Sequence, residues 1–320
     1  MHRREFLMGI PLLFTATPEP SRGEWVRCAD MPVARSEMPA TVLDGEIYVA
    51  GGFGAGSRAD RYDPATDRWQ RLADLPMETN HPGITTLGGR VIVAGGYAMN
   101  GASAHRGIWA YDPDDDAWEA IGELPEPMGA FGLTTLDDDL YLVGGALGSL
   151  NGEPSAAVWR RRAGDGSWEE RAPLAHAREH LAVVARDEQI HAVGGRAHGR
   201  DSDQLGSAVE RYDPTSDKWD LLAPLPHPRS GLNGAAACNS VVVAGGETSQ
   251  QVFADVQMLA TDGTHWASLP DLPVAVHGIA LASVNNRLFA IGGSTLAGRI
   301  QNVTAVSQLD LGTTRGTCAS

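Results

Sequence analysis

Six tryptophans in this chain are each followed, 26 residues later, by a Gly-Gly pair. The tryptophans are Trp25, Trp69, Trp118, Trp168, Trp219 and Trp266, and the pairs begin at Gly51, Gly95, Gly144, Gly194, Gly245 and Gly292. Successive tryptophans are 44 to 51 residues apart. A repeat of this length is typical of folds that stack copies of one supersecondary unit. The chain is therefore expected to contain six copies of one unit.

Each copy has the pattern of four antiparallel strands. A short run of branched and aromatic residues precedes every Gly-Gly pair, as at residues 47–50, and indicates a buried strand. Turn residues such as Asp44 and Gly45 separate this run from an earlier apolar run, as in a tight hairpin. A third strand follows the glycines, and the next tryptophan opens a fourth. Six such units predict an all-β fold, a six-bladed β-propeller.

The order of these signals resembles the Kelch repeat, in which an apolar strand ending in Gly-Gly is followed by Tyr-Asp-Pro and then Trp. Residues 25–312 resemble a Kelch propeller over nearly the whole chain. Tyrosine stands at Tyr62, Tyr111 and Tyr212, whereas the other units have Arg161, Leu259 and Leu309. The last unit ends after its third strand, so residues 25–29 are expected to supply its outer strand. This closure would remove two open strand edges.

The amino terminus, residues 1–24, resembles a twin-arginine export signal with a short linker. Arg3 and Arg4 are followed by Phe6 and Leu7 and then by a short apolar stretch. We therefore expect an exported protein, periplasmic or extracellular. A frayed tail with a chance Arg-Arg pair is the alternative. Residues 313–320 are expected to form a C-terminal tail.

Composition limits the partners that the chain can bind. Its net charge of −15 argues against nucleic acid and anionic membranes, since both bind basic surfaces. The chain lacks the apolar run of about 18 residues that a transmembrane helix needs. It also lacks phosphate-loop, dinucleotide and common hydrolase motifs, so no cofactor is expected. One propeller accounts for the 320 residues, and we expect a monomer.

Three cysteines are present, Cys28, Cys238 and Cys318. Cys28 lies on the closing strand and Cys318 follows the strand that should pair with it. A disulfide between these two would close a long loop in an oxidising compartment. Free thiols are the alternative. Cys238 is expected to be a small buried apolar residue.

The distance from each Gly-Gly pair to the next tryptophan varies from 18 to 25 residues, whereas the distance from tryptophan to Gly-Gly is constant. The variation lies in the loop between the second and third strands. Because successive strands are antiparallel, these loops emerge on the same face as the connections between blades. Length variation on one face of a rigid scaffold predicts a recognition surface there. Unconstrained drift of loop length is the alternative.

Alignment of the copies indicates which side chains reach the channel on that face. The position after Gly-Gly reads Phe53, Tyr97, Ala146, Arg196, Glu247 and Ser294. At the start of the innermost strand stand Ser36, Asn80, Gly129, Glu179, Ser230 and His277, followed by Glu37, His81, Ala130, His180, Gly231 and Gly278. The expected ligand contacts are Ser36, Glu37, Phe53, Asn80, His81, Tyr97, Glu179, His180, Arg196, Ser230, Glu247 and His277. Blade 3, with only glycine and alanine, is expected to be a bare wall.

The resemblance to Kelch proteins that capture peptides implies contact roles for Ser36, Asn80, Tyr97, Arg196 and Ser230. Carboxylates, hydroxyls and an aromatic ring suit a polyhydroxylated ligand or a basic peptide. The first interpretation is therefore a non-catalytic recognition module for a protein segment or a glycan. Read one at a time, the same side chains also suit ordinary solvated loop ends.

A carbohydrate-directed enzyme is the second interpretation. Some secreted Kelch propellers resemble sialic-acid mutarotases, and a mutarotase or epimerase needs only an acid–base pair beside a bound sugar. Glu37, Glu179, His180 or Glu247 with Arg196 could supply that pair. A closed pocket with shifted pKa values would favour the enzyme, and a broad, shallow rim would favour the binding module.

A metal site of three histidines is a further alternative. His81, His180 and His277 fall in alternate blades at nearly equivalent positions. His277 is one residue out of phase with the other two, so its side chain points to the other side of the strand. The channel mouth is also expected to be wide for ligands about 2 Å from one ion. No metal is therefore expected.

Overall fold

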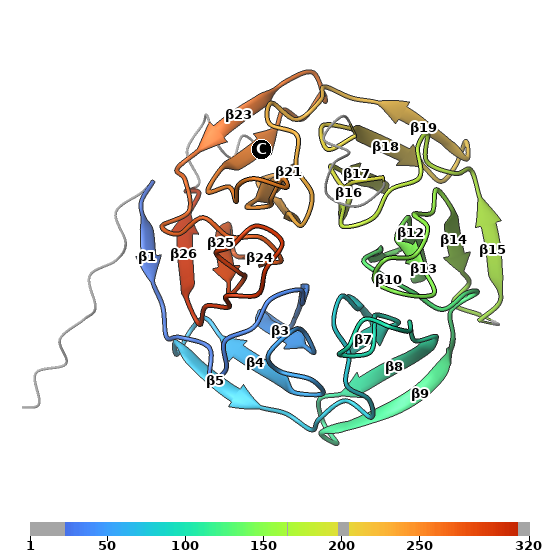
Figure 1. The fold of residues 1–320 in the computed structure, drawn as a ribbon, viewed down its shortest axis with the longest axis horizontal. Helices are drawn as coiled ribbons and strands as arrows, with labels where there is room; N and C mark the ends of the chain where they lie inside the picture. Colours follow the sequence, from blue (N-terminus) through green and yellow to red (C-terminus); the bar gives the residue numbers. More distant parts are fainter. Residues whose placement is uncertain (1–22, 165, 198–204, 313–320) are drawn as a thin grey trace, which may run out of the picture.

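The computed structural model describes residues 23–164, 166–197 and 205–312. Within these ranges every regular element is a β-strand, and six four-stranded antiparallel sheets surround a central axis (Figure 1). The predicted six-bladed β-propeller is confirmed. None of the described segments forms a helix suited to spanning a bilayer.

Each blade runs from an inner strand at the axis to an outer strand at the rim. Blade 1 contains β2 (Ala40–Leu43), β3 (Glu46–Ala50), β4 (Ala59–Asp63) and β5 (Arg68–Arg71). Blade 2 contains β6 (Gly83–Leu87), β7 (Arg90–Ala94), β8 (Gly107–Asp112) and β9 (Ala117–Glu123). Blade 3 contains β11 (Gly132–Leu136), β12 (Asp139–Val143), β14 (Val158–Arg161) and β15 (Trp168–Arg171), with β10 (Met128–Gly129) paired to β13 (Ala146–Leu147) beside them.

The other three blades repeat this order. Blade 4 contains β16 (Ala182–Arg186), β17 (Gln189–Val193), β18 (Val209–Asp213) and β19 (Lys218–Leu221). Blade 5 contains β20 (Asn233–Ala237), β21 (Ser240–Ala244), β22 (Val256–Leu259) and β23 (Trp266–Leu269). Blade 6 contains β24 (Ala280–Val284), β25 (Arg287–Ile291), β26 (Val306–Asp310) and β1 (Trp25–Arg27).

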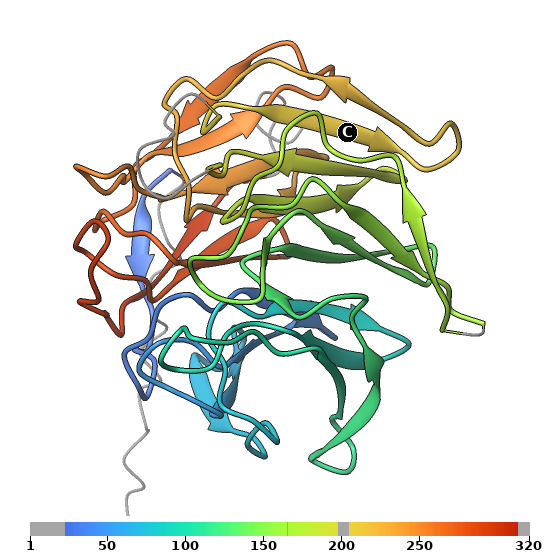
Figure 2. The same cartoon turned by 45° about the vertical axis from the view of Figure 1, so that its right-hand side comes forward.

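The two ends of the propeller meet in blade 6. Strand β1 pairs antiparallel with β26, in a register that joins Trp25 to Leu309 and Arg27 to Ser307. Figures 1 and 2 show β1 at the outer edge of the blade that the last strands of the chain build. The predicted closure of the ring is confirmed. Strand β1 forms hydrogen bonds with the edge of β26 that would otherwise be free.

The repeated tryptophans join each blade to the blade before it. Every indole Nε1 donates to a backbone carbonyl of the preceding blade or its connection, over 2.8 to 3.0 Å. The acceptors of Trp25, Trp69, Trp118, Trp168, Trp219 and Trp266 are the carbonyls of Pro270, Ala29, Ala73, Glu123, Ala172 and Ala223. A fixed position in every copy thus makes the same contact between blades.

The tyrosines of the repeat reinforce this contact. The Tyr62 hydroxyl donates to Asp67 over 2.6 Å, and the same carboxylate oxygen accepts the Ala29 amide of the closing segment over 2.7 Å. In blade 3, Arg161 replaces the tyrosine and donates to the Ile121 carbonyl over 2.7 Å. The departure from the repeat therefore keeps a hydrogen bond to the preceding blade.

The cysteines differ from the prediction. Cys28 is a buried free thiol. The predicted disulfide between Cys28 and Cys318 is therefore wrong, because Cys28 takes part in no disulfide. Burial raises the pKa of the Cys28 thiol. Cys238 is half-buried at the β20–β21 turn and is disulfide-bonded, which corrects its expected role as a plain apolar residue. Cys318 and most of the predicted export signal lie outside the described residues.

Candidate functional site

A ring of peptide hydrogen bonds encircles the channel. Each of its residues donates its N–H to the carbonyl of its counterpart in the preceding blade, over 2.8 to 3.0 Å. The ring consists of Glu37, His81, Ala130, His180, Gly231 and Gly278. It holds one residue of every blade, so it closes without a gap. The ring forms the floor of the space above it.

All members of this ring have a left-handed backbone, with φ between 53° and 62°. Such a conformation costs an L-residue about 1–2 kcal/mol, and glycine adopts it freely. Blades 5 and 6 have Gly231 and Gly278 there, whereas Glu37, His81 and His180 keep side chains at this cost. Strain of this kind gathers where side chains have a function.

Above the floor lies one cavity of about 460 Å³. Most of the predicted contacts line it: Ser36, Glu37, Phe53, His81, Glu179, His180, Arg196, Glu247 and His277. The structure therefore brings these residues together, and their binding of a ligand stays a prediction. The structure also pairs the two aligned positions of a blade with each other. Ser36 pairs with Phe53, Glu179 with Arg196 and Ser230 with Glu247 as isolated bridges.

Three predicted contacts lie behind the cavity wall. Tyr97 is fully buried, and its hydroxyl donates to the Ala146 carbonyl over 3.2 Å. The ring fills the space that blade 3 leaves, since a Cβ on Gly129 would lie 2.7 Å from it. Asn80 is buried and donates to the Tyr97 carbonyl over 3.1 Å, and Ser230 is 5% exposed. The structure assigns Tyr97 and Asn80 to supporting the wall, because their polar atoms already have protein partners.

Blade 3 is not the bare wall that the sequence predicted. Residues 150–154, in the loop after β13, line the cavity on that side. Residues 298–300, in the corresponding loop of blade 6, line it on another. Sequence reasoning missed both segments, because they lie outside the aligned positions. The signal for blade 3 was the interval of 24 residues from its Gly-Gly pair to the next tryptophan.

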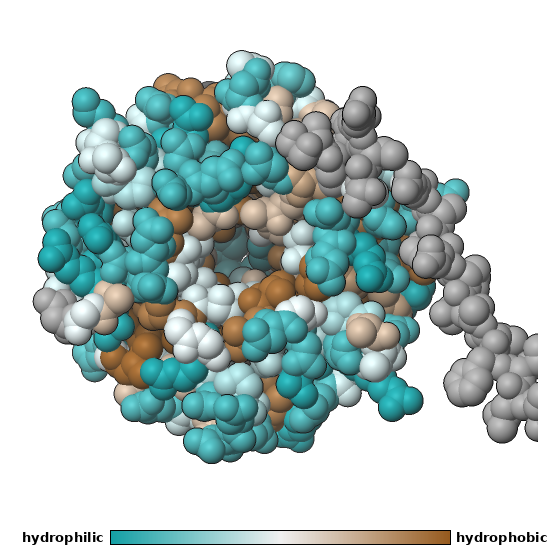
Figure 3. All heavy atoms as spheres, turned by 180° about the vertical axis from the view of Figure 1, so that it is seen from behind, coloured by the Kyte–Doolittle hydropathy of each residue, from teal (hydrophilic) through white to brown (hydrophobic). Residues whose placement is uncertain are grey.

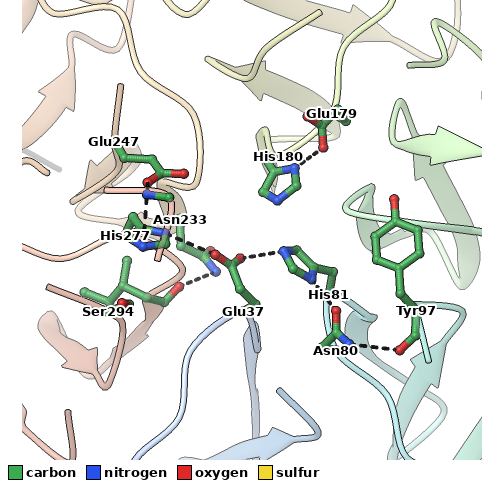
Figure 4. A network of polar contacts seen from close by, with 12 residues as sticks. Glu37, Asn80, His81, Tyr97, Glu179, His180, Asn233, Glu247, His277 and Ser294 are labelled. Atoms are coloured by element: carbon green, nitrogen blue, oxygen red, sulfur yellow. Dashed lines mark hydrogen bonds and ion pairs between the residues drawn. The ribbon is translucent and has the colours of Figure 1, made fainter. Parts of the chain in front are cut away.

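Glu37 lies at the centre of the polar network (Figure 4). One carboxylate oxygen is 3.1 Å from His81 Nε2, and the other is 3.1 Å from His277 Nδ1. Burial opposes the charge of Glu37, but the neighbouring imidazoles hold the pKa of its carboxyl well below the usual range. Glu37 is therefore a buried carboxylate shared by two histidines of different blades.

Arg196 joins the carboxylates of blades 4 and 5. Its Nε donates to Glu179 and its Nη1 to Glu247, the latter over 3.3 Å. Glu179 also accepts a hydrogen bond from His180 Nδ1. Burial opposes ionisation of Glu179, yet His180 and Arg196 lower the pKa of its carboxyl to about 2. Burial and the Arg196 charge lower the pKa of His180.

His277 has the opposite environment. Its Nε2 lies 3.0 Å from the Leu296 carbonyl and 3.6 Å from a Glu247 oxygen, and its Nδ1 faces Glu37. Although burial lowers it, the pKa of His277 is raised to about 9 by the hydrogen bond to Glu37 and by the charges of Glu37 and Glu247. At neutral pH the cavity thus holds an imidazolium in blade 6 and a neutral imidazole in blade 4.

Burial excludes the interpretation of these groups as solvated loop ends. His81, Glu179, His180, Glu247 and His277 are each 5–7% exposed. Several groups in the cavity also have shifted pKa values, as for Glu37, Glu179 and His277. Buried groups with shifted pKa values are expected of an enzyme site more than of a solvated rim.

The predicted three-histidine cluster forms only in part. The potential ligand atoms of Glu37, His81 and His180 all lie within 4.8 Å of one another. His277 stays outside this group on the far side of Glu37, which takes its place (Figure 4). The phase difference seen in the sequence explains this outcome, because His277 aligns with Glu179 and not with His180.

Parts of the chain are similar in sequence to the Kelch motif and to known proteins. Residues 34–76, 79–125 and 177–226 match the Kelch motif. The chain is 30% identical to Kelch-like protein 40a of Danio rerio over 123 residues, which cover 37% of this chain and 20% of that protein. It is 29% identical to alpha-scruin of Limulus polyphemus over 153 residues, which cover 45% of this chain and 16% of that protein.

A solved structure, that of YjhT, has the same fold. The superposition has a TM-score of 0.76 at 18% identity and covers 87% of this chain and 95% of that one. At this identity the likeness concerns the fold alone. The matched parts of the two relatives above span a fifth of their length or less.

Proposed function

Since this chain is a Kelch-repeat β-propeller, we propose that it binds a small polyhydroxylated ligand such as a sugar in the cavity at its axis. The observation that carries the proposal is a cavity of about 460 Å³ with a buried polar lining above the hydrogen-bonded ring. Small-molecule sites in proteins occupy about 300–1,000 Å³. A compact ligand fills such a space better than an extended segment, which could enter only as a loop tip.

The lining suits hydroxyl groups. Glu37, Glu179 and Glu247 present acceptors, and Arg196 and His277 present charged donors, so both sides of a hydroxyl find partners. Ser36 lines the cavity with its hydroxyl buried and without a hydrogen-bond partner. A buried polar group left in this state costs about 1–3 kcal/mol, which a ligand hydroxyl would recover. Phe53 adds an apolar face.

Titration calorimetry with neutral and acidic mono- and disaccharides and with basic peptides tests the proposal. Ser36→Ala is expected to weaken sugar binding about fivefold, the value of one hydrogen bond. Arg196→Ala should weaken it further. Ser103→Ala, in an exposed loop of blade 2, is the matched control and should leave the affinity unchanged. Binding of peptides alone, or equal affinities in Ser36→Ala and the wild type, would contradict the proposal.

A sugar mutarotase or epimerase is the second function, favoured by the two imidazoles of opposite charge. Neutral His180 can accept the proton of the anomeric hydroxyl at Nε2 while the bond from the anomeric carbon to the ring oxygen breaks. Imidazolium His277 gives a proton to that ring oxygen. Reclosure on the other face of the carbonyl reverses both transfers. Environments that push two pKa values apart are how one site holds an acid and a base.

Magnetisation exchange between sugar anomers in NMR spectra tests this function. His180→Asn is expected to slow catalysed exchange by about 100-fold or more, the size of one proton transfer. His105→Asn, in the half-buried loop of blade 2, serves as the control. Exchange at the uncatalysed rate with the wild type would leave ligand binding as the only function of the cavity.

A further inference from the structure

We propose that Glu37, His81 and His180 bind one divalent transition-metal ion at the floor of the cavity. Their potential ligand atoms already lie within 4.8 Å of one another. Two imidazoles and one carboxylate are a ligand set that zinc and non-haem iron use when open coordination positions face a substrate. The ring side chains of blades 3, 5 and 6 are no larger than a methyl group, so one side of the group stays open.

Each histidine is held by a second residue as a metal ligand would be. His81 Nδ1 lies 2.6 Å from the Asn80 side-chain oxygen, and His180 Nδ1 bonds to the Glu179 carboxylate. These contacts hold Nδ1 of each ring and leave Nε2 of both rings as the nitrogen that can face an ion. Metal-binding histidines almost always donate their other ring nitrogen in this way.

The carboxylate is held as well. His277 Nδ1 contacts one oxygen of Glu37 at 3.1 Å, and the other oxygen faces His81. The rings of Phe53 and Tyr97 lie edge-on to His81, with centroids 5.5 and 5.6 Å away, and restrict its rotation. All three proposed ligands stand on the hydrogen-bonded floor ring, so their backbones are fixed relative to one another.

Charge near the group is mixed. Arg196 Nη2 is 3.2 Å from His180 Nε2, and it has to turn away when a cation binds. It keeps Glu179 and Glu247 as acceptors, and these two carboxylates with Glu37 offset the positive charge of the ion. The open positions of the ion would face the cavity. In this point alone the inference rests on the proposed function, because two hydroxyls of a bound sugar could occupy those positions.

Titration of the chelator-treated full chain with Co²⁺ tests the site, since the visible absorption of Co²⁺ changes when imidazole and carboxylate replace water. One ion per chain is expected, and Zn²⁺ should displace it. Glu37→Gln and His81→Gln should each lower the affinity by 100-fold or more. Glu179→Gln should lower it about 10- to 100-fold by releasing Nδ1 of His180. His105→Gln is the matched control.

A second measurement does not depend on the variants folding. Paramagnetic Co²⁺ should broaden the ring signals of His81 and His180 in the NMR spectrum of the wild type before those of His105. No Co²⁺ binding, or binding unchanged in Glu37→Gln and His81→Gln, overturns the inference. Sugar titrations with and without the ion separate the two proposals, because metal binding is measured without sugar. Anomer exchange that rises when the metal is removed assigns His180 Nε2 to the base instead and also overturns it.

Discussion

At the residue scale, three equivalent arginines show how the repeat handles buried charge. Arg35 and Arg178 are fully buried, and they pair with Asp60 and Glu210 of their own blades. Arg229 occupies the same place in blade 5, 2% exposed, but the position of the carboxylate there holds Gln257, 3.5 Å away. Its Nε and Nη1 have no hydrogen-bond partner. Burial lowers the pKa of Arg229 to about 10.

A carboxylate in blade 5 should therefore stabilise the protein. Gln257→Glu is expected to raise the free energy of unfolding, because it gives the buried guanidinium of Arg229 the partner that Arg178 has. The reciprocal change Glu210→Gln should lower that free energy by about 3–5 kcal/mol by leaving Arg178 unpaired. Guanidinium denaturation of both variants measures the effect. Destabilisation by Gln257→Glu would show that desolvation of the new carboxylate outweighs the pairing.

His277 makes stability depend on alkaline pH. Its folded-state pKa of about 9 lies above the ordinary value of 6.5, so the native state holds the proton more tightly than the unfolded chain. The resulting stabilisation is complete below pH 6.5 and is lost as the pH rises through 9, an effect on the order of 3 kcal/mol. Denaturation at pH 6, 7.5 and 9.5 measures it. His277→Gln should show a smaller decline, and an equal decline in both proteins would assign it to other groups.

At the element scale, the outer strands are held by the tryptophans at their start. Trp118, in β9, donates its indole N–H to Ala73 of the preceding blade over 2.9 Å. Trp109, in the neighbouring strand β8, has a buried indole N–H without a partner. Blade 2 therefore contains one tryptophan whose indole donates a hydrogen bond to the preceding blade and one whose indole does not.

Phenylalanine substitutions separate these two cases. Trp118→Phe is expected to lower the free energy of unfolding by about 1 kcal/mol more than Trp109→Phe, because only the first loses a hydrogen bond. Both changes remove similar apolar area, so the difference isolates the indole N–H. Urea denaturation followed by circular dichroism measures both variants. Equal losses would mean that packing of the indole, and not its contact with the preceding blade, secures the outer strand.

At the scale of the whole molecule, the ring depends on the pairing of β1 with β26. A chain that begins at Ala29 would lack β1 and the hydrogen bond from the Trp25 indole to the Pro270 carbonyl. It would also lack the hydrogen bond from the Cys28 backbone N–H to the Val306 carbonyl. We expect a lower melting temperature and concentration-dependent association, because β26 becomes an exposed edge. Calorimetry and size-exclusion chromatography measure these effects. A peptide of residues 23–30 added in trans should reverse the association, and a truncated chain as stable as the full one would contradict this account.

Local signals sufficed for the architecture. The constant interval from tryptophan to Gly-Gly predicts six units, since turns, buried strands and hairpins depend on residues close in the chain. The same alignment predicts which positions reach the axis, and Ser36–Phe53, Glu179–Arg196 and Ser230–Glu247 pair as expected. Identical copies in a closed ring bring equivalent positions together, so most of the cavity lining followed from the repeat.

Only the tertiary structure decided how these residues act on one another. The sharing of Glu37 by His81 and His277 joins three blades, and no interval in the sequence encodes it. The sequence predicted Tyr97 as a ligand contact at the mouth of the channel. In the structure its ring packs against the small residues of blade 3 and forms part of the cavity wall. The free state of Cys28 and the loops that close the cavity were settled in the same way. The sequence determines each blade by short-range geometry, whereas burial and charge at the axis depend on six blades meeting.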